Sequence, residues 1–277
     1  MNNIFMNKTC ISFIILINFL LIVSCNQTKE NSKSLEQLEW KKEGQVLKTI
    51  ENIHFSFPDQ GFAFSNKEDL IKQCLESLKN NKKLIGLKEF NDSIYIRFLA
   101  SRKDMFPLTA TKASGIAYPH INTLYVVANE NQNPPIIHEL MHLIIMLKWG
   151  NPTDSSTWMN EGIGTYAENN CNGNNVAEIY RYFLEHNKLI SLNLLSSDFY
   201  KQPEMIGYHQ SAYIVEYLLS NYSIEQFKRL WTEGFENFEE IYAIPFSEVK
   251  GNFEKELIEK YPIAPKIDFE KFSQGCD

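Results

Sequence analysis

The sequence predicts an α+β protein in which a small β-sheet with a helix precedes a mainly helical second part. The segments that alternate apolar and polar residues all lie before residue 130, and residues 94–99 are the clearest of them. From residue 134 onward, apolar residues recur at helical spacing. The chain has 277 residues, of which 44% are hydrophobic, so it is long and apolar enough to bury a core.

The first part is predicted to contain four strands and one helix. Ser65 and Glu68 have the spacing of a capping box, which predicts a helix that runs from there to Leu78. Alternation or β-forming residues predict the strands, which are residues 54–60, 94–99, 114–118 and 123–128. We expect one small mixed or antiparallel sheet in a subdomain of residues 51–133.

The second part, residues 134–277, is predicted to be mainly helical. Pro134 and Pro135 can begin a helix, because a proline in the first turn loses no backbone hydrogen bond, and Gly150 can end it. Ser223 and Gln226 have the spacing of a further capping box. Other helical patterns lie around residues 157–170, 176–188, 208–222, 224–232 and 247–260.

The N-terminus has the features of a secretory signal peptide, with one lysine ahead of an apolar run from Ile11 to Val23. The run ends in Ile22-Val23-Ser24-Cys25, which resembles a bacterial lipobox. The alternative is an ordinary signal peptide with a chance cysteine. The polar segment after Cys25 favours the lipoprotein, because it suits a tether between a membrane and a domain. We expect removal of residues 1–24, lipidation of Cys25, a tether over residues 25–50, and export to the periplasmic or cell-surface side of a bacterial membrane.

Charge and cysteine content limit the partners of the chain. The net charge is −7, and no basic block is present, so nucleic acid is not an expected partner. Cys74 lies on the apolar stripe of a predicted helix, where a buried thiol is expected. Cys171 and Cys276 can pair in an oxidising compartment, but a single sequence leaves that pairing open.

The segment HELMH, residues 138–142, is the first chemical signal in the chain. On a helix, His138 and His142 project from the same face, so two imidazole nitrogens can bind one zinc ion. Glu139 lies about 100° around the helix, where its carboxylate can take a proton from water instead of binding the metal. Every neighbouring residue from 136 to 146 is apolar, so these polar groups are expected in a buried helix.

The segment TWMNEGIGTYAE, residues 157–168, adds a third ligand. Glu161 follows His142 by 19 positions and completes a set of two histidines and one carboxylate with an open fourth position. Gly162 and Gly164 each weaken a helix, which is expected where bulk is excluded at the crossing with the HELMH helix. A surface carboxylate is the alternative for Glu161.

HELMH, WMNEG and the later segment YHQSAYIVEYL, residues 208–218, together resemble the gluzincin zinc metallopeptidases. The likeness is greatest to the aminopeptidase branch that includes leukotriene A4 hydrolase, and it covers about residues 110–260. It implies a minimal thermolysin-like catalytic domain with the active site in the cleft between the sheet and the helical half. His138, His142 and Glu161 would hold one zinc ion, Glu139 would be the general base, and Tyr208 would donate to the oxyanion.

The resemblance implies further roles and also has a limit. Glu168, two helical turns after Glu161, would orient a ligand histidine, unless it is a solvated charge. Residues Ser114, Gly115, Ile116, Ala117 and Tyr118 would form the edge strand that pairs with the substrate backbone. The aminopeptidases also carry a Gly-x-Met-Glu-Asn stretch that captures a free amine, and this chain has no counterpart.

The sequence therefore predicts zinc-dependent hydrolysis of a peptide or protein substrate by a lipoprotein anchored to a membrane. Two alternatives share the same residues. The first is a zinc-containing surface lipoprotein that binds a partner without turnover. The second is a zinc hydrolase that acts on a non-peptide amide.

Overall fold

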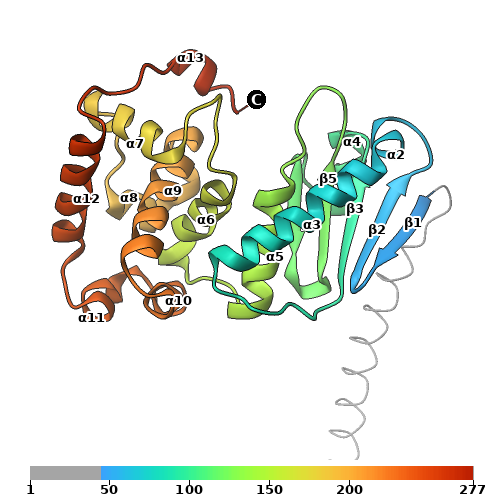
Figure 1. The fold of residues 1–277 in the computed structure, drawn as a ribbon, viewed down its shortest axis with the longest axis horizontal. Coiled ribbons are helices and arrows are strands. Elements are labelled where there is room, and N and C mark those ends of the chain that lie inside the picture. The colour runs from blue at the N-terminus through green and yellow to red at the C-terminus, as the bar shows by residue number, and fades with distance from the viewer. Residues whose placement is uncertain (1–44, 277) are drawn as a thin grey trace, which may run out of the picture. The chain divides into compact units, whose positions relative to one another are not determined.

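The computed structural model describes residues 45–276, which form a five-stranded sheet followed by a helical half (Figure 1). The predicted signal peptide, Cys25 and residues 25–44 of the predicted tether lie outside the described residues. The predicted α+β class is confirmed, since the sheet precedes most of the helices. Within the part of the chain that is described, no helix is long and apolar enough to cross a membrane.

The sheet has the strand order β1-β2-β3-β5-β4. β2 pairs with β3 and β3 with β5 in parallel, whereas β4 pairs with β5 antiparallel, so the sheet is mixed. The strands are β1 (Gln45–Ile50), β2 (Ile53–Pro58), β3 (Ile94–Leu99), β4 (Gly115–Tyr118) and β5 (Thr123–Val127). β1 was predicted as the end of the tether, but it pairs with β2 at one end of the sheet.

Helices of the first half differ from the prediction at their ends. α3 (Lys67–Leu84) extends beyond Leu78 and lies along the sheet (Figure 1). Its N-cap is Asn66, which makes no side-chain cap, so the capping box predicted at Ser65 is wrong. Ser65 instead ends a short helix, α2 (Phe62–Ser65), and α4 (Arg102–Thr109) was not predicted.

The helical half begins with α5 (Ile136–Trp149), which contacts α3, β4, β5 and α6 (Thr157–Glu168). The predicted burial of α5 is confirmed, because Leu140, Leu143 and Ile144 are fully buried. The capping box of Ser223 and Gln226 is also confirmed. The remaining helices of four or more residues are α7 (Val176–Glu185), α8 (Leu192–Asp198), α9 (Glu204–Asn221), α10 (Ile224–Glu233), α11 (Phe238–Tyr242), α12 (Phe246–Lys260) and α13 (Phe269–Phe272).

Two glycines let α6 approach its neighbours closely. A Cβ on Gly164 would lie 2.9 Å from the imidazole of His138 on α5, as expected for a crossing with the HELMH helix. A Cβ on Gly162 would lie 2.8 Å from the backbone of Ser211, so Gly162 faces α9 and not α5. The expectation for Gly162 was therefore wrong, although both glycines exclude bulk at a helix crossing.

Replacing Gly162 with alanine is expected to destabilise the fold by about 1–3 kcal/mol, because the added methyl overlaps the α9 backbone. The free energy of unfolding in urea measures this loss. Gly251→Ala in α12 is the matched control, since a Cβ there meets nothing within 4 Å and alanine favours a helix. Equal effects of the two substitutions would contradict the close packing of α6 on α9.

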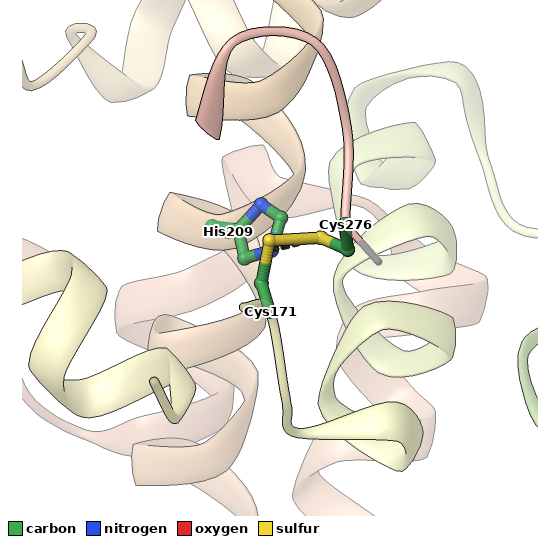
Figure 2. A group of neighbouring side chains, drawn as sticks. All are labelled: Cys171, His209 and Cys276. Atoms are coloured by element: carbon green, nitrogen blue, oxygen red, sulfur yellow. Dashed lines mark hydrogen bonds between the residues drawn. A yellow bond between two sulfur atoms is a disulfide. The ribbon is translucent and has the colours of Figure 1, made fainter. Parts of the chain in front are cut away.

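A disulfide between Cys171 and Cys276 resolves the pairing that the sequence left open. It joins the loop after α6 to the C-terminal tail, with 4.7 Å between the Cα atoms (Figure 2). His209 of α9 lies beside it, with Nε2 3.6 Å from the sulfur of Cys276. Cys74 is buried and is not in a disulfide, as expected, and burial raises the pKa of its thiol.

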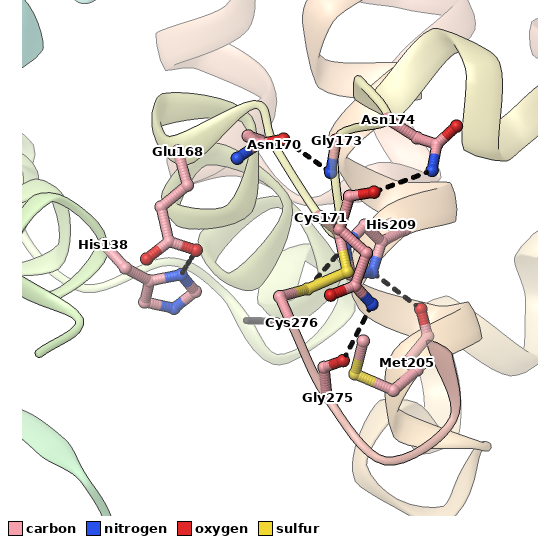
Figure 3. Close-up of a disulfide and its surroundings, with 11 residues drawn as sticks. His138, Glu168, Asn170, Cys171, Gly173, Asn174, Met205, His209, Gly275 and Cys276 are labelled. Atoms are coloured by element: carbon pink, nitrogen blue, oxygen red, sulfur yellow. Dashed lines mark hydrogen bonds and ion pairs between the residues drawn. A yellow bond between two sulfur atoms is a disulfide. The ribbon is translucent and has the colours of Figure 1, made fainter. Parts of the chain in front are cut away.

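His209 is held in one tautomer beside this disulfide. Its Nδ1 lies 2.9 Å from the carbonyl of Met205, which can only accept, so Nδ1 carries the hydrogen (Figure 3). Burial lowers the pKa of His209 to about 4, so the ring is neutral at physiological pH. The sulfurs of Cys171 and Cys276 and Nε2 of His209 lie close enough together to suggest a metal site. The two sulfurs are bonded to each other, however, so neither is a thiolate that could bind a metal.

Candidate metal centre

Helices α5 and α6 bring three potential metal ligands to one point. Nε2 of His138 lies 3.5 Å from Oε2 of Glu161, and Nε2 of His142 lies 3.4 Å from the same oxygen. His138 and His142 are one turn apart on α5, and Gly164 on α6 leaves room for the ring of His138. The structure therefore brings together His138, His142 and Glu161, as their spacing in the sequence predicts.

This donor set fits a zinc ion. Ligands about 2.0–2.1 Å from a tetrahedral zinc are separated by about 3.4 Å, which agrees with the observed 3.4 and 3.5 Å. His142 and Glu161 are only 6% and 7% exposed, so both are shielded from solvent that would otherwise satisfy them. Two imidazoles and one carboxylate leave a coordination position for water or substrate.

Mutual electrostatics hold the ligands in complementary charge states. Burial raises the pKa of Glu161, but the two histidines together outweigh burial and hold that pKa well below its ordinary value. Burial lowers the pKa of His138, and the carboxylates of Glu161 and Glu168 together raise it well above its ordinary value. Glu161 is therefore ionised, which is the form that binds a cation.

Glu168 lies against His138 on the side away from Glu161. Its Oε2 is 3.7 Å from Nδ1 of His138 (Figure 3). Nδ1 of His142, in contrast, is buried and has no hydrogen-bond partner among residues 45–276. The two histidines therefore differ in their surroundings. A carboxylate lies beside Nδ1 of His138 and can fix its ring, whereas Nδ1 of His142 has no such neighbour among the described residues.

Glu139 projects from α5 toward β4 and is not one of the converging ligands. A Cβ on Gly115 would lie 2.5 Å from Cγ of Glu139, so only glycine allows β4 to approach this side chain. Burial raises the pKa of Glu139, whereas the neighbouring histidines lower it, and the net shift is upward. A carboxylate with a raised pKa is a stronger base than an ordinary glutamate.

Strand β4 covers most of the predicted edge strand. It lies at one end of the sheet order and contains Gly115 to Tyr118, whereas Ser114 precedes it. The residues from Ser114 to Ala117 line the cavity over the ligands, but Tyr118 does not. The hydroxyl of Tyr118 instead donates to the carbonyl of Thr109 at 3.2 Å.

Two tyrosines of the helical half close the site. The ring of Tyr208 on α9 stacks on His138, with 6.3 Å between centroids and 18° between planes. Burial and then the charge of Glu161 raise the pKa of Tyr208, which keeps its hydroxyl protonated. Tyr200 was not predicted, yet its hydroxyl donates to Oε1 of Glu161 at 2.8 Å. The only sequence signal for Tyr200 is that it lies eight residues before Tyr208. That spacing belongs to no known motif, so the sequence does not predict the contact of Tyr200 with Glu161.

A cavity of about 570 Å³ opens over the ligands. It lies between β4 and helices α5, α6 and α9, so its walls come from both halves of the described chain. All predicted site residues from His138 to Tyr208 line it, and so do Arg102, Asn160 and Glu204. The structure therefore gathers the predicted residues from His138 to Tyr208 in one cleft.

The fold and the site together define an α+β protein with a buried cluster of two histidines and one carboxylate. Residues 60–241 match the model of the Peptidase MA superfamily, and the chain belongs to that superfamily. The resemblance to gluzincin peptidases is thereby confirmed at this level. Membership supports a hydrolase of the peptidase type.

The comparison with solved structures returns a more distant likeness. The crystal structure of an aminopeptidase N family protein from Idiomarina loihiensis matches with 13% sequence identity and a TM-score of 0.38. The match covers 83% of this chain and 46% of the other, so this chain spans less than half of that protein. A search of curated proteins finds no significant match.

Proposed function

We propose that this chain is a zinc-dependent peptidase that holds one zinc ion and hydrolyses peptide bonds. The observation that carries the proposal is the convergence of His138 and His142 on one oxygen of Glu161, at 3.5 and 3.4 Å, beside an open cavity. Superfamily membership supports the same class of reaction.

Glu139 is the proposed general base. A bound zinc ion supplies a Lewis acid that polarises the scissile carbonyl and acidifies the attacking water. The Glu139 carboxylate lines the same cavity, and its pKa is raised by burial, so it can take the proton of that water. The same carboxyl then gives the proton to the departing amine, which returns Glu139 to its starting state.

Tyr208 is the proposed oxyanion donor. Its ring is fixed on His138, and its raised pKa keeps the hydroxyl proton available. A hydrogen bond from this hydroxyl would strengthen as negative charge develops on the carbonyl oxygen in the transition state. Glu168 would assist indirectly, because its contact with Nδ1 fixes the ring of His138.

The outer edge of β4, which ends the strand order of residues 45–276, is the proposed binding site for the substrate backbone. An extended peptide can add to an exposed strand edge through main-chain hydrogen bonds, and residues Ser114 to Ala117 line the cavity. Gly115 keeps this edge close to Glu139. Aminopeptidase activity is not included in the proposal, because the chain lacks the amine-binding Gly-x-Met-Glu-Asn stretch.

Export and membrane attachment are part of the proposal and rest on the N-terminal sequence. Ile22-Val23-Ser24-Cys25 supports lipidation of Cys25, which would anchor the peptidase outside the cytoplasm of a bacterium. The disulfide of Cys171 and Cys276 supports an oxidising compartment. The mass of the mature N-terminus decides this point, since an unmodified Cys25 would exclude the anchor.

Metal content and cleavage measured on the same purified protein test the proposed function. We expect about one zinc per chain, cleavage of a peptide library, loss of cleavage in a chelator, and recovery when zinc is returned. A folded protein that binds no zinc, or cleavage that a chelator leaves unchanged, would exclude a zinc peptidase. Zinc binding without cleavage of peptides would favour a binding module or a hydrolase of another amide.

A further inference from the structure

Tyr200 combines an exposed ring with a partly buried hydrogen bond. Its side chain is among the large hydrophobic groups most open to solvent, with a relative exposure of 69%. Nevertheless its hydroxyl reaches Glu161, which is only 7% exposed, and donates to Oε1 at 2.8 Å. A solvent-facing tyrosine gains little from such a contact, so the bond matters chiefly for the carboxylate.

The two oxygens of Glu161 have different neighbours. Oε2 faces Nε2 of His138 and Nε2 of His142, whereas Oε1 accepts from Tyr200 and, at 3.5 Å, from the amide of Asn160. An ionised carboxylate without such donors can rotate and offer either oxygen, or both, to a cation. The hydroxyl of Tyr200 therefore lies on Oε1, the oxygen that does not face the histidines.

The backbone of Tyr200 is anchored although its ring is exposed. The residue lies in a single 3₁₀ turn (Phe199–Lys201) between α8 and α9. The ring of Phe199 is buried and contacts Tyr200 edge-on, with 5.3 Å between centroids. Lys201 and Gln202 both hydrogen-bond back to Asp198. These contacts hold the turn in place, so the hydroxyl can act as a fixed donor.

We propose that Tyr200 is a positioning residue that holds Glu161 so that a single oxygen, Oε2, is offered to the metal. The inference rests on the proposed function, since it assigns a role toward the zinc ion that this function requires. Tyr200 acts through Glu161 and not on the substrate. Its removal should therefore weaken metal binding before it alters substrate binding.

The test compares Tyr200→Phe with Tyr217→Phe. Tyr217 is the matched control, because its hydroxyl also meets a glutamate, Glu256, at 3.1 Å, but away from the metal ligands. The zinc affinity of each purified protein is measured by competition with a chromogenic chelator. We expect Tyr200→Phe to bind zinc about 10- to 100-fold more weakly, and Tyr217→Phe to bind it as the unmodified protein does.

Kinetics at saturating zinc provide a second readout. Phenylalanine keeps the ring that lines the cavity, so we expect Tyr200→Phe to lower kcat and to leave KM unchanged. Equal zinc affinity and equal kcat in Tyr200→Phe and the unmodified protein would overturn the inference alone. An unmodified protein that binds no zinc would overturn the proposed function and this inference with it.

Discussion

Replacing Glu139 with glutamine is expected to lower kcat/KM by about 10²- to 10⁴-fold while the bound zinc is retained. Glutamine keeps the size of the side chain, which is essential where β4 approaches so closely at Gly115. It cannot accept a proton from water, so the step assigned to the base is lost. The retained zinc follows from the geometry, because the three converging donor atoms belong to other residues. Peptide cleavage and zinc content measured on one preparation check both halves of the prediction.

Glu204→Gln is the control for this substitution. Glu204 lines the same cavity, so its replacement removes one negative charge from the cavity without removing the proposed base. A comparable loss of activity in both variants would attribute the effect to cavity charge instead of proton transfer. Loss of zinc from Glu139→Gln would instead assign Glu139 to the metal site.

The ligand helices could be predicted because their signals are local. The apolar sequence around HELMH predicts a buried helix, and a spacing of four residues places His138 and His142 on one face. Glu161 required more than periodicity, since helical spacing alone does not show that α6 crosses α5. The motif around Glu161 predicted that α6 meets α5 at the metal site. The distances of 3.5 and 3.4 Å from Oε2 of Glu161 to Nε2 of His138 and of His142 agree with that prediction.

The two glycines of α6 show where the prediction failed for a geometric reason. Gly162 and Gly164 are two residues apart, and each residue of a helix turns by about 100°, so their faces lie about 160° apart. They cannot both face α5. Gly164 contacts His138 on α5, and Gly162 therefore meets Ser211 on the opposite side, where α9 packs.

Tyr200 could not be predicted because no local pattern encodes its contact. The residue lies 39 positions after Glu161, in a 3₁₀ turn without apolar periodicity. The strand β1 (Gln45–Ile50) was not predicted for a related reason. It follows a highly polar stretch, and it forms a strand because it pairs with β2 in the sheet. Such contacts depend on how distant segments meet in space.

Loss of the disulfide is expected to destabilise the fold by about 4–5 kcal/mol, because Cys171 and Cys276 close a loop of 105 residues. The bond restricts the unfolded chain, and a long loop gives a large entropic effect. It also holds the tail that carries Phe272, which is 2% exposed and packs on Phe183 and His209. Urea unfolding of Cys171→Ser/Cys276→Ser against the unmodified protein measures the difference.

A reductant provides the internal control for this prediction. It should lower the stability of the unmodified protein toward that of the double variant and leave the variant unchanged, because Cys74 is not in a disulfide. Burial also raises the pKa of the Cys74 thiol, which keeps it protonated and slow to exchange. If the double variant unfolds at the same urea concentration as the unmodified protein, the disulfide contributes little to stability and the prediction is wrong.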